Sequence, residues 1–399
     1  MNVPKLRFGE FATEERQRST LGNLTKWSSG GTPSKENPNF WEGDIPWISA
    51  STMRGLYYSD SEVRITSEGL KNGSKLAEKG DLLLLVRGSM LFNKIPVGIA
   101  ECDLAFNQDV KSLKPNPELN ASYLLQWFQA SEHKLLSMVV GTGIGAGKLE
   151  TSDVQSIDFL LPSKKEQQKI ADFLSAVDDK ITFLTAQKTA LTQYKQGMMQ
   201  RIFSQTLRFK DDNGADYPDW KIQPIGGYLI EYKEQSVKHG EFEVLTSSNR
   251  GLIRQRDYYG ENRLTERDNE GFNVIPHGYI TYRSRSDNSK FTFNLNLLGI
   301  TGVISVYYPV FSIHNGDNRF WVEYLNFHWK DISIYSVGTS QKVLALSALR
   351  SIKMSLPTKN EQTKIAQFLT ELDDKINAVD AQIQSAQQWK QGLLQQMFV

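Results

Sequence analysis

The sequence predicts an α+β protein of mixed α/β character, with two globular domains joined by two long, antiparallel-packed helices and an internal pseudo-twofold repeat. The first observation is the repeat itself: a shift of 195 residues aligns residues 161–203 with 356–398 without a gap, with 22 identities in 43 positions. The second is a heptad pattern of apolar residues in both copies. The third is a set of short apolar or alternating runs, typical of strands, together with one helical stretch; the runs are residues 82–86, 279–282 and 300–307, and the helical stretch is 121–136.

Length and composition agree with several folded domains. A chain of 399 residues can hold two or three domains, each with its own core. Apolar residues make up 39% and charged residues 23% of the chain, and the mean hydropathy is -0.43, which is typical of a folded protein. We expect four segments in this order: a globular domain at 1–160, a helix at 161–205, a second globular domain at 206–355 that begins with a turn-rich linker at 206–217, and a second helix at 356–399.

Each helical copy begins with a capping box. Ser163 or Thr358 follows a proline, and Glu166 or Glu361 stands three positions later. The hydroxyl can accept a hydrogen bond from the third residue of the helix, while the glutamate reaches back to the N–H of the capping residue. We therefore predict that both helices begin at these positions.

The apolar residues of both copies recur in steps of four and three, which defines a helix–helix seam. Because each seam needs a partner, we expect the two helices to pack against one another as a coiled coil. Lys188 interrupts the first seam. Gly197 and Gly392 indicate either a tolerated kink or a close approach of the two backbones. The seam residues are Ile170, Leu174, Val177, Ile181, Leu184, Leu191, Met198, Ile365, Leu369, Leu372, Ile376, Val379, Ile383 and Leu393.

The two globular domains share a few landmarks and otherwise differ in sequence. A glycine turn at residues 79–82 precedes an apolar run that ends at Arg87, and a similar turn at residues 277–280 precedes Arg283 and Arg285. A Gly-Thr pair stands before each helix, at residues 141–142 and 338–339. We infer that the domains are variants of one fold with different surfaces.

Several classes of site are not expected. The longest apolar run has five residues, far below the roughly 18 that a membrane span needs. The N-terminus lacks a secretory signal and Cys102 is the single cysteine, so we expect a cytoplasmic protein without an internal disulfide. Five scattered histidines predict no metal site. We find no catalytic triad, paired-carboxylate cleft or Walker motif, so no catalytic residues are predicted.

Nucleic-acid contacts, if present, must come from local clusters, because the net charge is only +1 and no segment is a basic arm. Seven arginines and no lysine lie between Arg250 and Arg285, and an arginine fork can bind guanine bidentately. A solvated surface is the alternative. The glycine-rich residues 141–148 are interpreted as a loop, with a nucleotide site or a DNA-backbone contact as alternatives. The candidate DNA-binding residues are Arg54, Arg87, Lys94, Lys148, Arg283, Arg285, Lys290 and Lys342.

The duplicated Leu-Pro-x-x-x-Glu-Gln-x-x-Ile pattern at residues 161–170 and 356–365 resembles the specificity subunits of type I restriction-modification enzymes. Residues 30–34 (GGTPS) and 41–48 (WEGDIPWI) resemble the opening of the target recognition domains in that family. The resemblance covers essentially the whole chain.

This resemblance implies a non-catalytic protein in a DNA-methylating restriction system. Each target recognition domain would read one half of an asymmetric bipartite site in double-stranded DNA, and the helices would set the spacing between the halves. Two methyltransferase (modification) subunits would dock on the helices, and restriction or translocase subunits would join complexes that cleave DNA. S-adenosylmethionine, ATP and Mg would bind these partners, with no cofactor bound by this chain and no membrane involved.

Two other functions remain open at this point. A coiled-coil adaptor or scaffold without sequence-specific DNA binding would have the same repeat. A methyltransferase or nuclease that acts alone would show activity as a purified chain. The residues do not reveal the target sequence, because base readout depends on which side chains reach the groove and on DNA shape.

Overall fold

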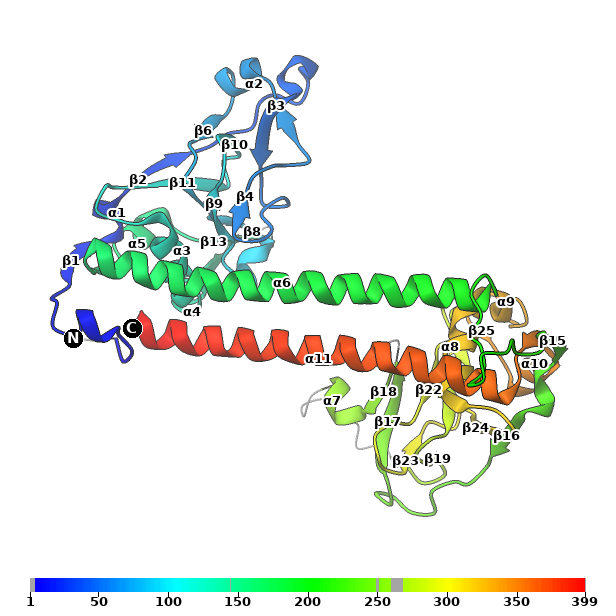
Figure 1. The fold of residues 1–399 in the computed structure, drawn as a ribbon. Helices are drawn as coiled ribbons and strands as arrows, with labels where there is room; N and C mark the ends of the chain where they lie inside the picture. Colours follow the sequence, from blue (N-terminus) through cyan, green and yellow to red (C-terminus); the bar gives the residue numbers. More distant parts are fainter. Residues whose placement is uncertain (1–3, 144, 249–250, 260–267, 399) are drawn as a thin grey trace. The chain divides into compact units, whose positions relative to one another are not determined.

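A computed structural model describes residues 4–143, 145–248, 251–259 and 268–398. The chain divides into two compact units: unit 1 contains Met1–Ala186 and Val379–Val399, and unit 2 contains Gln187–Ala378. Each unit therefore consists of one globular domain, one end of the first long helix and the opposite end of the second (Figure 1).

The domain of unit 1 is built on two sheets. The larger has the strand order β2-β11-β7-β9-β4, and its central strand β7 (Leu82–Leu85) consists of four buried leucines. The smaller has the order β5-β3-β10-β6, in which β3 and β10 are parallel. The other strands are β2 (Thr25–Ser29), β3 (Trp41–Ile48), β4 (Tyr57–Tyr58), β5 (Arg64–Ile65), β6 (Lys75–Ala77), β9 (Val97–Ala100), β10 (Leu104–Phe106) and β11 (Val110–Pro115).

The domain of unit 2 repeats this topology with different residues. One sheet has the order β16-β24-β20-β22, which matches β2-β11-β7-β9. The other has the order β18-β17-β23-β19, with β17 and β23 parallel, which matches β5-β3-β10-β6. The two domains are thus variants of one fold, as predicted. The strands are β16 (Leu229–Tyr232), β17 (Glu243–Ser248), β18 (Gly251–Arg254), β19 (Asn273–Ile275), β20 (Ile280–Tyr282), β22 (Phe293–Leu295), β23 (Gly302–Ile304) and β24 (Val310–Ile313).

The short helices of the two domains also correspond. Asn120 caps α3 (Ala121–Ala130) and Asp317 caps α8 (Asn318–Phe327), and each of these helices is followed by one more short helix and then by a short two-residue strand. The remaining short helices are α1 (Leu21–Leu24), α2 (Ser67–Lys71), α4 (Glu132–Ser137), α5 (Thr151–Gln155), α7 (Gln255–Tyr259), α9 (Trp329–Ser333) and α10 (Leu346–Ser351).

The first and last strands of each domain pair with one another directly before the long helix begins. In unit 1, β1 (Gln17–Thr20) pairs antiparallel with β14 (Asp158–Leu161). In unit 2, β15 (Lys221–Pro224) pairs antiparallel with β26 (Lys353–Leu356). Each domain is therefore closed at the point where the chain enters the helix.

The long helices are α6 (Lys164–Phe203) and α11 (Lys359–Met397), with 40 and 39 residues. In unit 1 the start of α6 packs against the end of α11, and in unit 2 the end of α6 packs against the start of α11, so the packing is antiparallel. Within the described residues, no helix has both the length and the apolar character required to cross a membrane.

The seam residues are all buried or half-buried. Ile181, Leu191, Met198 and Ile376 are half-buried, and the other ten predicted seam residues are buried. At Gly197 and Gly392 an added Cβ would meet no described atom within 4 Å. The close backbone approach considered for these two glycines is therefore absent within the described structure.

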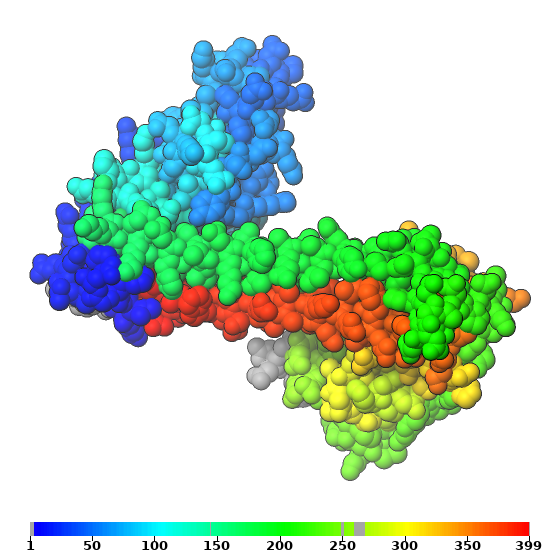
Figure 2. Space-filling view, viewed as in Figure 1, coloured from blue at the N-terminus to red at the C-terminus, as the bar shows by residue number. Residues whose placement is uncertain are grey.

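The N-terminal segment lies at the joined ends of the two helices in unit 1. The Leu6 N–H donates to the Gln396 carbonyl at 3.0 Å, and Figure 2 shows this segment, in blue, beside the start of α6 and the end of α11. The Phe8 ring meets Phe173 of α6 edge to face at 5.9 Å. Unit 2 has the equivalent contact between Phe209 and Phe368, with ring centroids 5.4 Å apart.

Candidate nucleic-acid interface

A short antiparallel ribbon brings two of the predicted DNA-binding residues together in unit 1. Strand β8 (Arg87–Gly88) pairs with β13 (Gly147–Lys148), so that Arg87 and Lys148 are direct cross-strand neighbours. A third strand, β12 (Val140–Gly141), completes the ribbon. Arg87 and Lys148 are exposed, and Lys148 forms a surface ion pair with Glu150 at 2.5 Å.

The same ribbon occurs in unit 2. Strand β21 (Arg285–Ser286) pairs with β25 (Lys342–Val343), and Val337 bridges to Val343 on the far side. The Leu149 N–H donates to the Val86 carbonyl, and the Leu344 N–H donates to the Ser284 carbonyl. These two matching bonds make Arg87 and Arg285 equivalent, because each residue directly follows the acceptor.

Arg285 differs from Arg87 in its surroundings. Its guanidinium carbon lies 4.1 Å from the centroid of the Tyr307 ring, a cation–π contact that orients the side chain without neutralising it. Lys342 is half-buried and pairs with Ser286 across the ribbon. Arg283 and Lys290 are exposed and line a hollow of about 280 Å³ together with Arg285.

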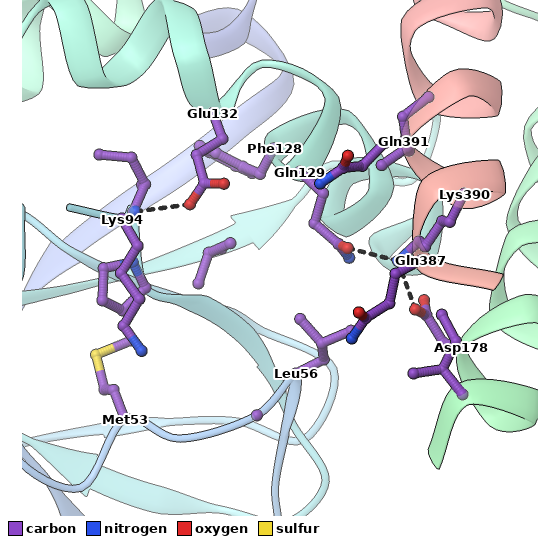
Figure 3. A pocket seen from close by; sticks show the side chains of 16 residues that line it. Met53, Leu56, Lys94, Phe128, Gln129, Glu132, Asp178, Gln387, Lys390 and Gln391 are labelled. Atoms are coloured by element: carbon purple, nitrogen blue, oxygen red, sulfur yellow. Dashed lines mark hydrogen bonds and ion pairs between the residues drawn. The ribbon is translucent and has the colours of Figure 1, made fainter. Parts of the chain in front are cut away.

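The structure separates the other two candidates of unit 1 from its ribbon. Arg54 is exposed in the turn after Met53. Lys94 is exposed and lines a hollow of about 590 Å³ between the domain and the two helix ends of unit 1 (Figure 3). The sequence named all four residues as candidates alike, and the structure brings Arg87 and Lys148 together while Arg54 and Lys94 lie outside the ribbon.

The glycine-rich residues 141–148 form the turn between β12 and β13. The Thr142 N–H and hydroxyl both donate to the Ala146 carbonyl, at 2.7 and 2.8 Å. A dinucleotide-binding fingerprint requires a helix that begins within the glycine run, whereas here the chain continues into β13. The described part of this segment is therefore a hairpin loop, and residue 144 lies outside the described residues.

The arginine-rich stretch of the second domain contains two kinds of residue. Arg254 and Arg256 both form ion pairs with Glu243, at 2.9 and 3.1 Å. Arg283 and Arg285 form no ion pair with any residue that the structure describes. Arg250, Arg263 and Arg267 lie outside the described residues.

The start of α6 is held by a buried carboxylate. Ser163 Oγ accepts a hydrogen bond from the Glu166 N–H at 3.4 Å. The Glu166 carboxylate is fully buried and binds Arg7 and Arg16, each at 2.7 Å. The capping box had predicted that this carboxylate would accept a hydrogen bond from the Ser163 N–H instead. The guanidinium donors are charged and therefore outcompete a neutral N–H. Burial acts to raise the pKa of Glu166, but the hydrogen bonds from both arginines bring it below its ordinary value.

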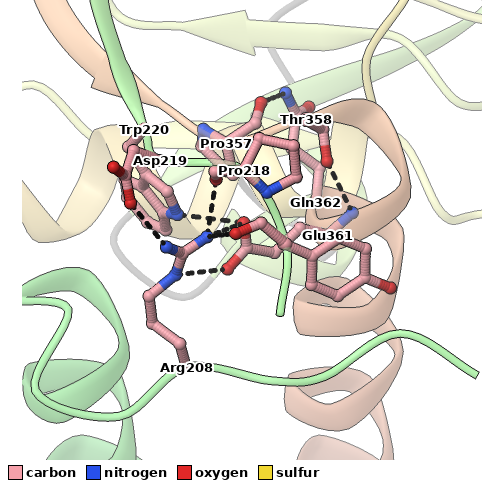
Figure 4. A network of polar contacts seen from close by, with 9 residues as sticks. Arg208, Pro218, Asp219, Trp220, Pro357, Thr358, Glu361 and Gln362 are labelled. Carbon is pink, nitrogen blue, oxygen red and sulfur yellow. Dashed lines mark hydrogen bonds and ion pairs between the residues drawn. The ribbon is translucent and has the colours of Figure 1, made fainter. Parts of the chain in front are cut away.

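The start of α11 repeats this arrangement in unit 2 (Figure 4). Thr358 Oγ1 accepts from the Glu361 N–H at 3.5 Å. Glu361 binds Arg208 at 2.9 Å and accepts a hydrogen bond from Trp220 Nε1 at 3.1 Å. The predicted return bond from the glutamate to the cap is replaced here too, for the same reason. The Leu-Arg-Phe echo at residues 6–8 and 207–209 is the sequence signal for this anchor.

Two equivalent lysines join the helices, and the sequence reasoning did not single them out. In unit 1, Lys390 of α11 binds Asp178 of α6 and Gln129 of α3. In unit 2, Lys195 of α6 binds Asp373 of α11 at 2.8 Å and Glu323 of α8 at 3.0 Å. Burial lowers the pKa of Lys390 despite Asp178, whereas Glu323 and Asp373 together outweigh burial and raise the pKa of Lys195.

Among the described residues, no group of three or more histidine, cysteine, aspartate and glutamate side chains is arranged to hold a metal ion. The arrangement that the structure does present is one exposed arginine on the same ribbon of each domain. Such a side chain can contact a phosphate or a base edge in a DNA groove.

Comparison with known proteins identifies the family. The family model described as the type I restriction modification DNA specificity domain matches residues 13–193 and 225–386. The specificity subunit of the Escherichia coli type I restriction enzyme EcoR124I/EcoR124II is 31% identical over 170 residues, which cover 42% of this chain and 42% of that protein. The chain therefore matches less than half the length of this relative.

Two further matches extend over most of the chain. The specificity subunit of the type I restriction enzyme MjaVIII of Methanocaldococcus jannaschii is 23% identical over 381 residues, covering 89% of this chain and 85% of that one. The crystal structure of a type I restriction-modification system S subunit from M. genitalium has the same fold, with a TM-score of 0.60 at 16% identity, covering 100% of this chain and 99% of that chain. Because the family model matches both halves, the chain belongs to the family of type I restriction-modification DNA specificity proteins and carries two copies of their specificity domain.

Proposed function

We propose that this chain selects the DNA sequence on which a type I restriction-modification complex acts. The domain of each unit reads one half of an asymmetric bipartite target, while α6 and α11 set the distance between the halves and dock two methyltransferase subunits. The observation that carries this proposal is the equivalent position of Arg87 and Arg285 on the ribbons of two domains with different sequences.

The division of labour follows from what is repeated and what is not. Helices that share 22 of 43 residues can present like surfaces to two copies of one partner. Domains that share a topology but few residues can read unlike bases, so the two half-sites should differ. The chemistry belongs to the partners in this proposal: they bind S-adenosylmethionine, and in cleaving complexes ATP and Mg²⁺. The relatives, which are named specificity subunits, support this assignment.

The test is a map of N6-methyladenine in DNA from cells that express this chain with a type I methyltransferase subunit. We expect one asymmetric bipartite motif, absent when either protein is expressed alone. Methylation by the chain alone would instead support an enzyme. If the pair is expressed and no motif appears, the adaptor function replaces the one proposed here.

A domain exchange tests which domain reads which half. Replacing residues 218–350 with the corresponding domain of another specificity protein should change one half of the motif and leave the other half unchanged. The reciprocal exchange of residues 15–155 is the matched control and should change the other half. Changes in both halves after a single exchange would contradict the division of labour.

A further inference from the structure

We propose that the domain of unit 2 holds one backbone phosphate of the DNA in a cationic pocket that the domain of unit 1 lacks. This inference rests on the proposed function and assigns a ligand class to a single hollow. The hollow measures about 280 Å³ and lies where the end of β17 meets the segment that follows β20. Three cations line it: Arg283, Arg285 and Lys290.

Within the described residues, no ion pair balances the charge of the three cations. None of the three cations forms an ion pair within the described part of the chain, whereas Arg254 and Arg256 of the same domain share Glu243. The single carboxylate in the lining, Asp287, accepts a hydrogen bond from Gln341 at 3.1 Å. Three neighbouring like charges repel one another, and a bound anion relieves that repulsion.

The surrounding residues support two of the three cations, Arg285 and Lys290. The Tyr307 ring supports Arg285, and Lys290 Nζ lies 5.7 Å from the centroid of the Trp329 ring. The Asn288 side chain accepts hydrogen bonds from the Ser286 hydroxyl at 2.8 Å and from the Lys290 N–H at 3.1 Å, which fixes the turn between them. The pocket is thus formed before a ligand arrives, which lowers the cost of binding.

The lining fits a phosphate better than a base. Besides the cations it contains Thr246, Ser247 and Thr292, whose hydroxyls can donate hydrogen bonds. A phosphate oxygen accepts charge-assisted hydrogen bonds from such a set, and an arginine binds phosphate bidentately. A base edge also presents hydrogen-bond donors, which need acceptors. The one carboxylate in the described lining, Asp287, already accepts a hydrogen bond from Gln341.

The domain of unit 1 has no equivalent pocket residue at the position of Arg283. Because Arg285 corresponds to Arg87, Arg283 corresponds to Leu85, which is fully buried in β7. The two half-sites should therefore be held differently: the ribbon arginine is common to both domains, while the phosphate pocket belongs to unit 2.

The test uses the full chain in complex with its methyltransferase subunit and a duplex that contains the mapped motif. Arg283→Gln combined with Lys290→Gln should remove two of the three cations that hold the phosphate. The slope of log K against log salt should then fall by about 0.9, since one neutralised phosphate contributes about 0.9, and affinity near 0.1 M salt should drop about tenfold. The methylated motif should stay the same, because phosphate contacts carry no base information.

Lys353→Gln is the matched control. Lys353 is exposed on β26 of the same unit, outside the pocket, and its replacement should leave the slope unchanged. An unchanged slope in the double variant would overturn the proposal that the pocket binds a DNA phosphate. This holds also if the pocket binds a free anion. A changed base in the second half-site, or a 2-aminopurine signal in that half-site that is lost in the double variant, would show base contact and overturn the phosphate assignment. Failure of the proposed function is distinguishable, because the wild-type pair would then give no motif.

Discussion

The carboxylates of Glu166 and Glu361 fasten the segment that precedes each domain to the start of the helix that follows it. Both side chains are almost completely buried. Their cationic partners lie 150 to 159 residues away in the sequence. A buried carboxylate is stable only when it is paired and hydrogen-bonded. These two residues therefore join the beginning of each half of the chain to its helix. Their N–H groups also donate to the helix caps, Ser163 and Thr358.

Replacing one of these carboxylates should be costly. Glu166→Gln deprives Arg7 and Arg16, with 11% and 9% of their side chains exposed, of the buried carboxylate that they share. We expect a loss of about 3–5 kcal/mol in the free energy of unfolding of unit 1. Glu10→Gln, which removes the exposed ion pair with Lys169, is the control and should cost less than about 1 kcal/mol. Urea unfolding followed by tryptophan fluorescence measures both, and equal losses would contradict the anchor.

The same carboxylate should make stability depend on pH. The pKa of Glu166 is lower in the folded chain than its ordinary value of 4.5. The unfolded chain therefore takes up the proton first, so this stability is present above pH 4.5 and is lost as pH falls through the folded pKa. We expect the stability difference between wild type and Glu166→Gln to shrink below pH 4.5 in unfolding curves recorded at several pH values. A difference that is independent of pH would show that the charge has no role.

The ribbon arginines should act on one half-site each. Arg87→Gln should weaken discrimination at one position of the first half-site by about 1–3 kcal/mol. Arg285→Gln should weaken binding of the second half-site and leave the first half-site unchanged. The measurement is the methylated motif of each variant. Arg256→Gln serves as the control, because Arg256 already forms an ion pair with Glu243. Relaxation of both halves by a single substitution would be incompatible with this assignment.

At the scale of elements, the two long helices are joined by a charged contact that repeats with the chain. The repeat shift of 195 residues takes Asp178 to Asp373 and Lys195 to Lys390. The ion pair between Lys195 and Asp373 is therefore equivalent to the one between Lys390 and Asp178. Each also binds a helix of its own globular domain, α8 or α3. Buried ion pairs are best attested as devices that fix register. We infer that this contact fixes the antiparallel alignment of α6 and α11 and the seating of each domain on its helix ends.

A double-mutant cycle tests this contact. Lys390→Met alone should cost about 3–5 kcal/mol because Asp178 stays buried without its cation, and Asp178→Leu alone should cost a similar amount. The double variant should recover a large part of the loss, with a coupling energy of about 1–3 kcal/mol in unfolding experiments. Lys169→Met, in an exposed pair with Glu10, is the control. Additive losses would mean that the two residues do not act as a pair.

The sequence predicted the elements whose signal is local. The heptad pattern and the caps predicted both helices, and the glycine turns at Gly80 and Gly278, which have φ of 95° and 82°, marked the buried strands that lead to Arg87 and Arg285. Lys195 and Lys390 could not be recognised, because a lysine in such a helix normally faces solvent and its partners here come from distant segments. The glycine landmarks predicted that the two domains share a fold, but their strand order could not be predicted, since the paired strands are mostly three to six residues long and differ in sequence.

At the scale of the whole molecule, the two charged contacts constrain how the lengths of α6 and α11 can change. Asp178 and Lys195 of α6 are 17 residues apart, and so are Asp373 and Lys390 of α11. An insertion between these positions in α6 alone makes the two spacings unequal, so both contacts cannot form at once. An insertion of the same length in both helices preserves the match.

We therefore expect a matched insertion of one heptad in α6 and in α11 to keep the fold and to lengthen the gap in the methylated motif. Seven helical residues add about 10 Å, which corresponds to up to about three base pairs of DNA at roughly 3.4 Å each. The bases of both half-sites should stay the same, because neither domain is altered. The insertion in α6 alone is the matched control and should lower the unfolding midpoint and the yield of methylation. A gap that stays unchanged with both helices lengthened would mean that α6 and α11 do not set the spacing.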